Sequence, residues 1–381
     1  MARYKLSEVV MRIKDKVDKD NTELEYYIGG EHFDNGEICI TKRGVIKEST
    51  IGPAFHMRFK PGDVLLMSRN PHLRKAGVVD FEGICSDVSY VCRTRDENVL
   101  MQRFLPFIFQ TDAFWKFAEE NKGGSTNFFL NWSDFERYEF DLPPIEEQRR
   151  LTEILWAAQN AKLAYKELLR QTDELVKSQF IELFGDPITN PMGWPVGKLG
   201  HHANIVAGNP FDSKGYTDEG IKICGGLIIM PDKIAWEECK HWPTADGLEQ
   251  FLLQENDVVL AMDRPWISDG FKIAKIKPSE LPALLIQRTA RIRGTDIVQD
   301  YLLHMLCHPS FKEHCKITAT TVPHISMKDI SDFPILIPPI EIQKSFVSFV
   351  QQTDKSKFEI KKAIENTSAL IKSLMQQDLT N

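Results

Sequence analysis

A short phrase that occurs twice most constrains how this chain of 381 residues can fold. The segment FDLPPIEEQRRL begins at Phe140, and the segment ILIPPIEIQKSF begins at Ile335. Pro143 of the first copy and Pro338 of the second copy lie 195 residues apart. A repeat at this distance predicts two related halves within one chain.

Each copy of the phrase is expected to begin a long helix. Proline is tolerated in a first helical turn because its missing N–H would have no partner there. Glu146 and Glu147 then lie where the positive end of the helix dipole favours acidic side chains. After Leu151 the apolar positions recur at alternating steps of four and three, which is the pattern of a coiled-coil seam. Gly185 and Pro187 are expected to end the first helix.

The seam keeps its register when 195 is added to every position. Even its polar members correspond, since Lys162 and Thr172 match Lys357 and Thr367. Polar seam residues cost stability and usually fix register or partner, so chance similarity of two amphipathic helices is the weaker explanation. The predicted seam residues are Leu151, Leu155, Tyr165, Leu169, Val176, Phe346, Val350, Ile360, Ile364 and Ile371.

The segments before the two helices also correspond. KPGDVLLMSRNP, from Lys60, resembles QENDVVLAMDRP, from Gln254. Both are typical of a strand that leads into a polar turn with an arginine. We pair Arg69 with Arg264 as these arginines, the second copy being one residue longer between its aspartate and its arginine.

This order predicts an α+β protein with two homologous α/β domains, residues 1–142 and 187–336, each followed by a long helix, 143–186 and 337–381. About 35 helical residues at ~1.5 Å each span roughly 50 Å. The connecting segment DPITNPMGWPVG reaches at most ~40 Å when fully extended. We therefore expect an antiparallel coiled coil of the two helices and a pseudo-two-fold molecule.

Charge and cysteine usage narrow the classes of function. The net charge of −7 argues against a protein that coats nucleic acid without discrimination, although it permits small basic patches. Seven cysteines without disulfide or zinc spacing predict reduced thiols and no metal site. No apolar run approaches the ~20 residues of a membrane helix. With no export signal expected, the predicted location is cytoplasmic.

These motifs resemble those of the specificity subunits of type I restriction-modification enzymes. The resemblance covers essentially the whole chain, through LPPIEEQ, IPPIEIQ, GDVLLMSRNPHLRKAGVVDFEGICSD, YIGGEHFDNG, NKGGSTNFFLNW and TTVPHISMKDISDFPI. It implies two target-recognition domains, each reading half of a bipartite site in the major groove of double-stranded DNA. It also implies that the long helices bind two methyltransferase subunits, which modify adenine N6 with S-adenosylmethionine. Motor-nuclease subunits, using ATP and Mg²⁺, would complete the complex.

The chain itself carries no recognisable catalytic set. An amino-methyltransferase of this kind needs an Asn/Asp-Pro-Pro-aromatic loop, whereas the Pro-Pro pairs here lie in LPPI and IPPI. The nearest approach to a phosphate loop, GYTDEGIK from Gly215, has Ile221 where lysine must follow glycine. We therefore predict a non-catalytic subunit with no cofactor or metal of its own.

Polar loops are the expected DNA contacts, because loops held on a scaffold often carry recognition. Arginine can pair with guanine, and asparagine with adenine. The candidates of the first domain are Lys42, Arg43, Lys47, Arg69, Asn70, His72, Arg74, Lys75, Lys122, Ser125, Thr126 and Asn127. Those of the second domain are Asn209, Ser213, Lys214, Arg264, Trp266, Thr320, Thr321 and His324. A solvated loop charge is the alternative for any single residue, as is a structural role for Trp266 and the histidines.

Other functions stay open at this point. A scaffold protein whose coiled coil only joins two modules explains the helices but not the paired turns. A nuclease within one domain is a third possibility. Within the family, the complex either restricts DNA, only methylates it, or belongs to a related phage-defence system.

Because each predicted domain precedes its own helix, replacing residues 1–142 with a relative's domain should change one half of the DNA target. The other half should stay unchanged. Methylome sequencing of cells that carry the chimaera reads both halves. A change in both halves together would contradict the two-domain interpretation.

Overall fold

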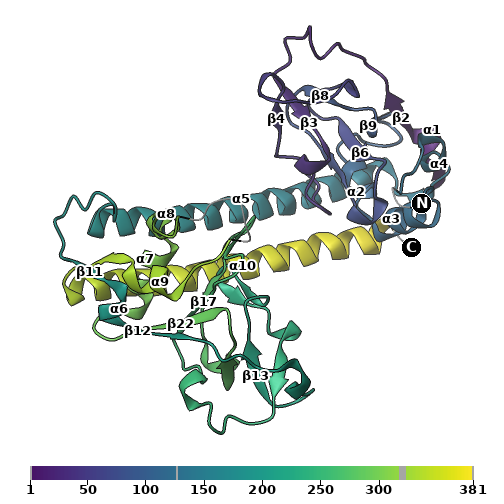
Figure 1. Ribbon diagram of the computed structural model, residues 1–381. Helices are drawn as coiled ribbons and strands as arrows, with labels where there is room; N and C mark the ends of the chain where they lie inside the picture. The colour runs from purple at the N-terminus through teal and green to yellow at the C-terminus, as the bar shows by residue number, and fades with distance from the viewer. Residues whose placement is uncertain (1, 126–127, 317–322, 380–381) are drawn as a thin grey trace. The chain divides into compact units, whose positions relative to one another are not determined.

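The computed structural model describes residues 2–125, 128–316 and 323–379 (Figure 1). The chain divides into two compact units that both mix helix and sheet. Unit 1 is Met1–Leu169 with Glu359–Asn381, and unit 2 is Arg170–Phe358. Both long helices therefore contribute residues to both units.

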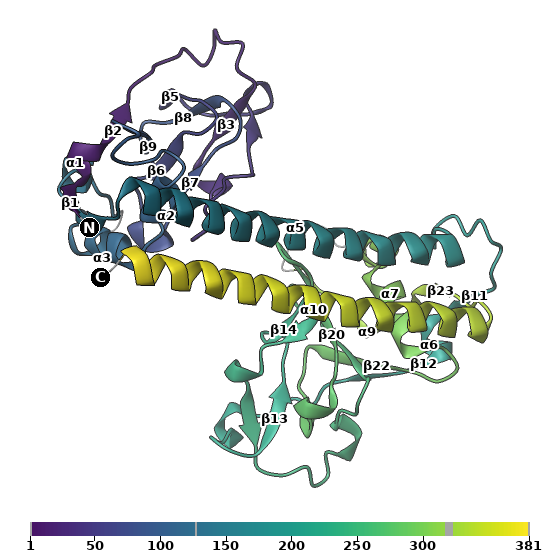
Figure 2. The same cartoon turned by 180° about the vertical axis from the view of Figure 1, so that it is seen from behind.

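Unit 1 contains two four-stranded sheets, ordered β2-β9-β6-β7 and β4-β3-β8-β5. The first sheet is antiparallel throughout, whereas β3 and β8 of the second sheet pair in parallel. Figure 2 shows β3, β5 and β8 together. The strands are β2 (Val10–Ile13), β3 (Tyr26–Ile28), β4 (Gly44–Val45), β5 (Phe55–Phe59), β6 (Val64–Met67), β7 (Ala76–Val78), β8 (Gly83–Ser86) and β9 (Ser89–Thr94).

Short elements connect these sheets to the first long helix. Strand β1 (Ala2–Lys5) pairs antiparallel with β10 (Glu139–Leu142), which leads into the double proline. Thr111 begins α3 by accepting a hydrogen bond from the backbone N–H of Phe114 at 3.2 Å, as an N-cap does. The short helices are α1 (Leu6–Val9), α2 (Leu105–Ile108), α3 (Asp112–Glu120), α4 (Trp132–Phe135), η1 (Gly30–His32), η2 (Ile46–Glu48) and η3 (Pro71–Leu73).

Unit 2 has a similar arrangement of strands, with three strands in its second sheet where unit 1 has four. Its antiparallel sheet is ordered β12-β22-β17-β20, and its second sheet, β16-β13-β21, again contains one parallel pair. Strand β11 pairs with β23 as β1 pairs with β10. The strands are β11 (Val196–Lys198), β12 (Ala203–Ala207), β13 (Ile221–Cys224), β14 (Ile229–Met230), β15 (Lys233–Ile234), β16 (Lys240–Trp242), β17 (Val258–Ala261), β18 (Trp266–Ile267), β19 (Gly270–Phe271), β20 (Ile273–Lys275), β21 (Ala283–Leu285), β22 (Thr289–Gly294) and β23 (Pro334–Leu336). The short helices are α6 (Leu199–His202), α7 (Gln299–Cys307), α8 (Pro309–His314), α9 (Met327–Asp332), η4 (Ser213–Gly215), η5 (Trp236–Glu238), η6 (Glu249–Phe251) and η7 (Pro278–Glu280).

The long helices are α5 (Ile145–Phe184) and α10 (Ile340–Leu379), each of 40 residues. Both begin directly after a double proline, as the sequence predicts. Gly185 follows α5 with φ +74°, a backbone conformation that glycine adopts without a steric penalty. Its N–H donates to the Ile181 carbonyl at 2.8 Å, which completes the last turn.

The predicted seam is buried at the ends of the helices and half-buried between them. Six of its residues are buried, namely Leu151, Leu155, Val176, Phe346, Val350 and Ile371. The other four are half-buried, namely Tyr165, Leu169, Ile360 and Ile364. Leu169 and Ile364 lie outside the buried clusters that the sheets form with the helix ends, so their place in a seam stays a prediction.

The glutamine that ends LPPIEEQ and IPPIEIQ explains why this motif occurs twice. Gln148 is fully buried; its Oε1 accepts from the Met101 N–H at 3.1 Å, and its Nε2 donates to the Pro143 carbonyl at 2.9 Å. Gln343 is also buried; its Oε1 accepts from the Val298 N–H at 2.9 Å. The Gln343 Nε2 donates to the Pro338 carbonyl at 2.8 Å. Each glutamine therefore joins the first turn of its helix to a loop of its own unit.

Replacing Gln148 with leucine should lower the free energy of unfolding by about 2–4 kcal/mol, because it leaves buried backbone groups without partners. Urea denaturation of the whole chain measures this. Arg149→Ala, which removes an exposed side chain from the same helical turn, is the matched control and should cost about 0.5 kcal/mol or less. Equal stabilities of the two variants would contradict this role of the glutamine.

Candidate nucleic-acid interface

In each unit, the turn after a central strand is hydrogen-bonded to the loop before a short helix. In unit 1 the Leu130 N–H donates to the Ser68 carbonyl at 2.9 Å. In unit 2 the Ile325 N–H donates to the Met262 carbonyl at 2.8 Å. These bonds bring two of the sequence-selected loops together in each unit.

The same geometry corrects the expected pairing of Arg69 with Arg264. Asn70 and Arg264 both have left-handed backbones, with φ +51° and +45°. The N–H of each donates into the facing loop, to Phe128 at 2.9 Å and to Pro323 at 2.8 Å. Arg264 therefore corresponds to Asn70, and the residue that corresponds to Arg69 is an aspartate. Alignment by the arginine of each turn required one extra residue in unit 2. In the structure both turns follow their strands at the same distance, so there is no extra residue.

A buried aspartate anchors the start of the strand that leads into each of these turns. Asp63 and Asp257 are buried at the starts of β6 and β17, and each accepts two hydrogen bonds from an arginine guanidinium on the adjacent strand, Arg93 or Arg293. The bond to the aspartate is the main cause that raises the pKa of each arginine. Two-pronged bonds of this kind hold the geometry of a strand end well.

Six sequence-selected residues of unit 1 are exposed. They are Lys42, Arg43, Lys47, Arg69, His72 and Ser125. The Arg69 guanidinium lies 5.8 Å from the centroid of the Phe129 ring, which leaves it accessible at the edge of the loop pair. Thr126 and Asn127 lie outside the described residues. DNA contact by this set stays a prediction.

Several basic candidates of unit 1 also have partners within the fold. Lys42 forms an ion pair with Asp34 at 2.6 Å. The Arg43 guanidinium lies over the ring of Tyr26, 4.0 Å from its centroid. Lys122 forms an ion pair with a glutamate of α3 at 2.6 Å. Exposed ion pairs are weak, so phosphate could replace these carboxylates.

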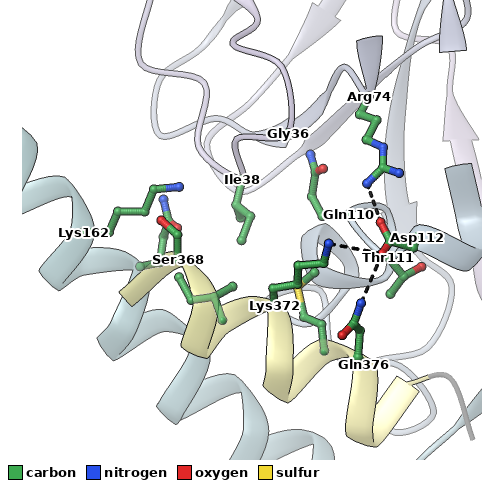
Figure 3. Close-up of a pocket in the computed structure, with 13 residues that line it drawn as sticks. Gly36, Ile38, Arg74, Gln110, Thr111, Asp112, Lys162, Ser368, Lys372 and Gln376 are labelled. Carbon is green, nitrogen blue, oxygen red and sulfur yellow. Dashed lines mark hydrogen bonds and ion pairs between the residues drawn. The ribbon is translucent and has the colours of Figure 1, made fainter. Parts of the chain in front are cut away.

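Arg74 belongs to a charged network in unit 1 (Figure 3). Its guanidinium donates to Asp112 Oδ1 at 2.5 Å. Lys372 and Gln376 approach the other carboxylate oxygen at 3.6 and 3.2 Å, beside a cavity of about 210 Å³. The hydrogen bond from Arg74 is the main cause that lowers the pKa of Asp112. Arg74 therefore ties the candidate loop to Asp112 of α3, which in turn contacts α10.

Glu37 forms a second charged link in unit 1. Lys162 and Lys166 of α5 each approach its carboxylate at 2.9 Å. Burial raises the pKa of Glu37, but the hydrogen bonds from the two lysines outweigh burial and hold the pKa below its usual value. The lysine of the predicted seam thus pairs with the sheet domain.

The double glycine that lies in each unit, Gly29-Gly30 and Gly225-Gly226, was not among the residues selected from the sequence. In unit 1, Lys75 Nζ donates to the Gly30 carbonyl at 2.7 Å. In unit 2, Lys272 Nζ donates to the Gly226 carbonyl. Lys272 is buried, and burial, with the nearby charge of Arg264, lowers its pKa. The repeated Gly-Gly of YIGGEH and ICGGLI was the signal that could have found it.

In unit 2, Arg264 is exposed beside a cluster of charged groups. Asp263 Oδ1 lies 2.6 Å from His324 Nδ1, and its Oδ2 accepts from Arg288 at 2.9 Å. Burial raises the pKa of Asp263, but the bonds from His324 and Arg288 hold it below its usual value. Arg264 and Arg288 are both exposed cations beside this aspartate.

Trp266 packs within unit 2. Its ring stacks on Phe271 with centroids 4.7 Å apart and an interplanar angle of 16°. Lys312 lies 5.7 Å from the tryptophan ring centroid. This packing agrees with the structural alternative for Trp266.

The remaining candidates of unit 2 lie in two places. Asn209 is half-buried, and Ser213 and Lys214 are exposed in η4. Thr320 and Thr321 lie outside the described residues. Across the described ranges, no group of three histidine, cysteine or carboxylate side chains is placed to hold a metal ion. Nor does any helix in those ranges combine the length and apolarity needed to cross a membrane.

Known proteins resemble this chain in sequence and fold. A family described as "Type I restriction modification DNA specificity domain" matches residues 241–367. The type I restriction enzyme EcoAI specificity subunit of Escherichia coli is 31% identical over 195 residues, 46% of this chain and 32% of that protein. The type I restriction enzyme MjaVIII specificity subunit of Methanocaldococcus jannaschii is 26% identical over 254 residues, 60% of each chain.

A solved structure, the type I restriction-modification system S subunit from M. genitalium, has a similar fold. The match has a TM-score of 0.60 and 13% identity, and it covers 100% of this chain and 96% of that one. The chain spans about a third of the E. coli relative and three fifths of the M. jannaschii relative. The resemblance expected from the motifs is confirmed.

The two carboxylates of unit 1 predict how its stability depends on pH. Glu37 and Asp112 have lowered pKa values in the folded protein, so their ion pairs contribute fully above the unfolded-state pKa values, near 4. The contribution is lost as the pH falls through the lower folded-state values. A Glu37→Gln, Asp112→Asn variant should therefore lose less stability than the wild type between about pH 7 and about pH 3.

Urea unfolding midpoints at several pH values measure this difference. Glu97→Gln, at an exposed turn position, is the control and should keep the wild-type pH dependence. Parallel pH profiles for the double variant and the wild type would exclude the proposed linkage.

Proposed function

We propose, from the premise that this chain is a relative of type I restriction-modification specificity subunits, that it recognises double-stranded DNA for such a complex. Its target would be bipartite, with one half read by each unit. The rest of the complex would supply the chemistry, since we infer a non-catalytic role for this chain.

One observation carries this proposal. The four-stranded antiparallel sheets of the two units have the same strand order and the same loop pairing, but with different polar side chains at equivalent positions. Asn70 corresponds to Arg264, and these residue types favour different bases, adenine and guanine. A constant framework with exchanged side chains is what an asymmetric two-part target requires. A scaffold that only joins two modules gives no reason for it.

The long helices are the proposed binding sites for two methyltransferase subunits. Several large apolar side chains on them are exposed, namely Ile154, Leu168, Leu175, Ile181, Phe358 and Leu370. Exposed apolar patches commonly mark protein interfaces. In this proposal α5 and α10 pack antiparallel as a coiled coil, and the molecule is pseudo-two-fold.

The partners would carry the cofactors. Methyltransferase subunits would use S-adenosylmethionine to modify adenine N6, and motor-nuclease subunits would use ATP and Mg²⁺. The net charge of −7 supports this division, because a chain with only local basic loops gains affinity for DNA from a partner. A methylation-only complex is the alternative within the same family.

Single-arginine variants test the two-part target. Within the complex, Arg264→Ala should weaken discrimination at one base pair of one half-site by about 1–3 kcal/mol, which is roughly 5- to 150-fold. Arg69→Ala should act only on the other half-site. Binding to duplexes that vary one base pair at a time measures both effects.

Arg3→Ala is the control, since Arg3 is exposed and pairs with Glu139 away from the candidate loops. It should leave both half-sites unchanged. If Arg264→Ala and Arg69→Ala affected the same half-site, the assignment of one half to each unit would be wrong.

A further inference from the structure

Leu227 has an unusual setting in unit 2. Its side chain is 90% exposed, although the next two residues, Ile228 and Ile229, are buried. The N–H groups of both isoleucines donate to the Gly225 carbonyl, at 3.1 and 3.2 Å. These hydrogen bonds and the two buried isoleucines fix the backbone of the turn, and the Leu227 side chain projects from it into solvent.

This turn adjoins the Arg264 turn. The Gly226 carbonyl accepts from Lys272 Nζ, and the Lys272 N–H donates to the Pro265 carbonyl at 2.7 Å. A Cβ atom added at Gly226 would lie 3.5 Å from the Ala261 side chain, at the end of β17. Lys272 therefore connects the two turns directly, and Leu227 belongs to the same surface as the proposed guanine-reading arginine.

The equivalent position in unit 1 carries a different side chain. There the double glycine is followed by Glu31, which is exposed, and Lys75 holds the Gly30 carbonyl as Lys272 holds that of Gly226. The supporting contacts are the same in both units. The exposed residue that follows them changes from acidic to apolar, as expected of a position that selects between bases.

We propose that Leu227 is a specificity-determining residue that packs against the C5-methyl group of a thymine in the half-site read by unit 2. This inference rests on the proposed DNA recognition. The thymine methyl is the apolar group that base edges present in the major groove, and apolar side chains contact it there. A leucine makes no favourable contact with phosphate, so a base edge is the fitting partner at this place.

Deoxyuridine provides the test because it lacks only this methyl group. The wild-type chain, in complex with its methyltransferase subunits, is assayed on duplexes in which each thymine of the target is replaced in turn. At one position in one half-site, binding should weaken about fourfold, the effect of losing one buried methyl. In the Leu227→Ala complex, thymine and deoxyuridine should bind equally at that position.

Ile188→Ala is the matched control, because Ile188 is 56% exposed and follows α5 outside the candidate loops. It should keep the wild-type response to deoxyuridine. A Leu227→Ala complex that keeps that response, or that binds both duplexes more weakly by the same factor, overturns the inference. So does a wild-type complex that binds its target specifically yet tolerates every thymine replacement. Absence of any specific binding by the wild type would overturn the proposed function as well.

Discussion

A buried glutamine at the first turn of each long helix is the interaction on which the rest of the structure depends. Gln148 and Gln343 use both ends of their amide groups on backbone atoms of the double proline and of a loop in the same unit. Buried amides bind their partners in one geometry, and leaving those partners unpaired is costly. The direction in which each helix leaves its sheet domain is therefore set at this residue.

Charged contacts of unit 1 also join its sheet domain to the long helices. Glu37 links its domain to α5, and Asp112 links it to α10. The candidate loops follow strands whose starts are held by Asp63 and Asp257. A rigid framework of this kind lets a few loop side chains differ between units while the backbone that presents them stays the same.

The sequence could predict the elements whose signals are local. The double prolines, the acidic first turn and Gly185 mark the ends of the helices, and the repeated phrase reveals the two related halves. Partners that are distant in the sequence could not be predicted. Met101 lies far from Gln148 in the chain, and nothing near Arg74 indicates that its charge meets Asp112. Pairing by residue type also failed for Arg69, because backbone conformation, not side-chain identity, defines equivalent positions in a turn.

The central claim is that each domain is fixed to its helix, so that the helices set the distance between the two half-sites. Inserting four residues after Thr172 adds about one helical turn, ~6 Å, and nearly restores the seam. At ~3.4 Å per base pair, methylome sequencing should then show unchanged half-sites with a spacer longer by about one or two base pairs. An insertion of two residues rotates the helix by ~200° and should abolish methylation. An active four-residue variant with an unchanged spacer would contradict the account.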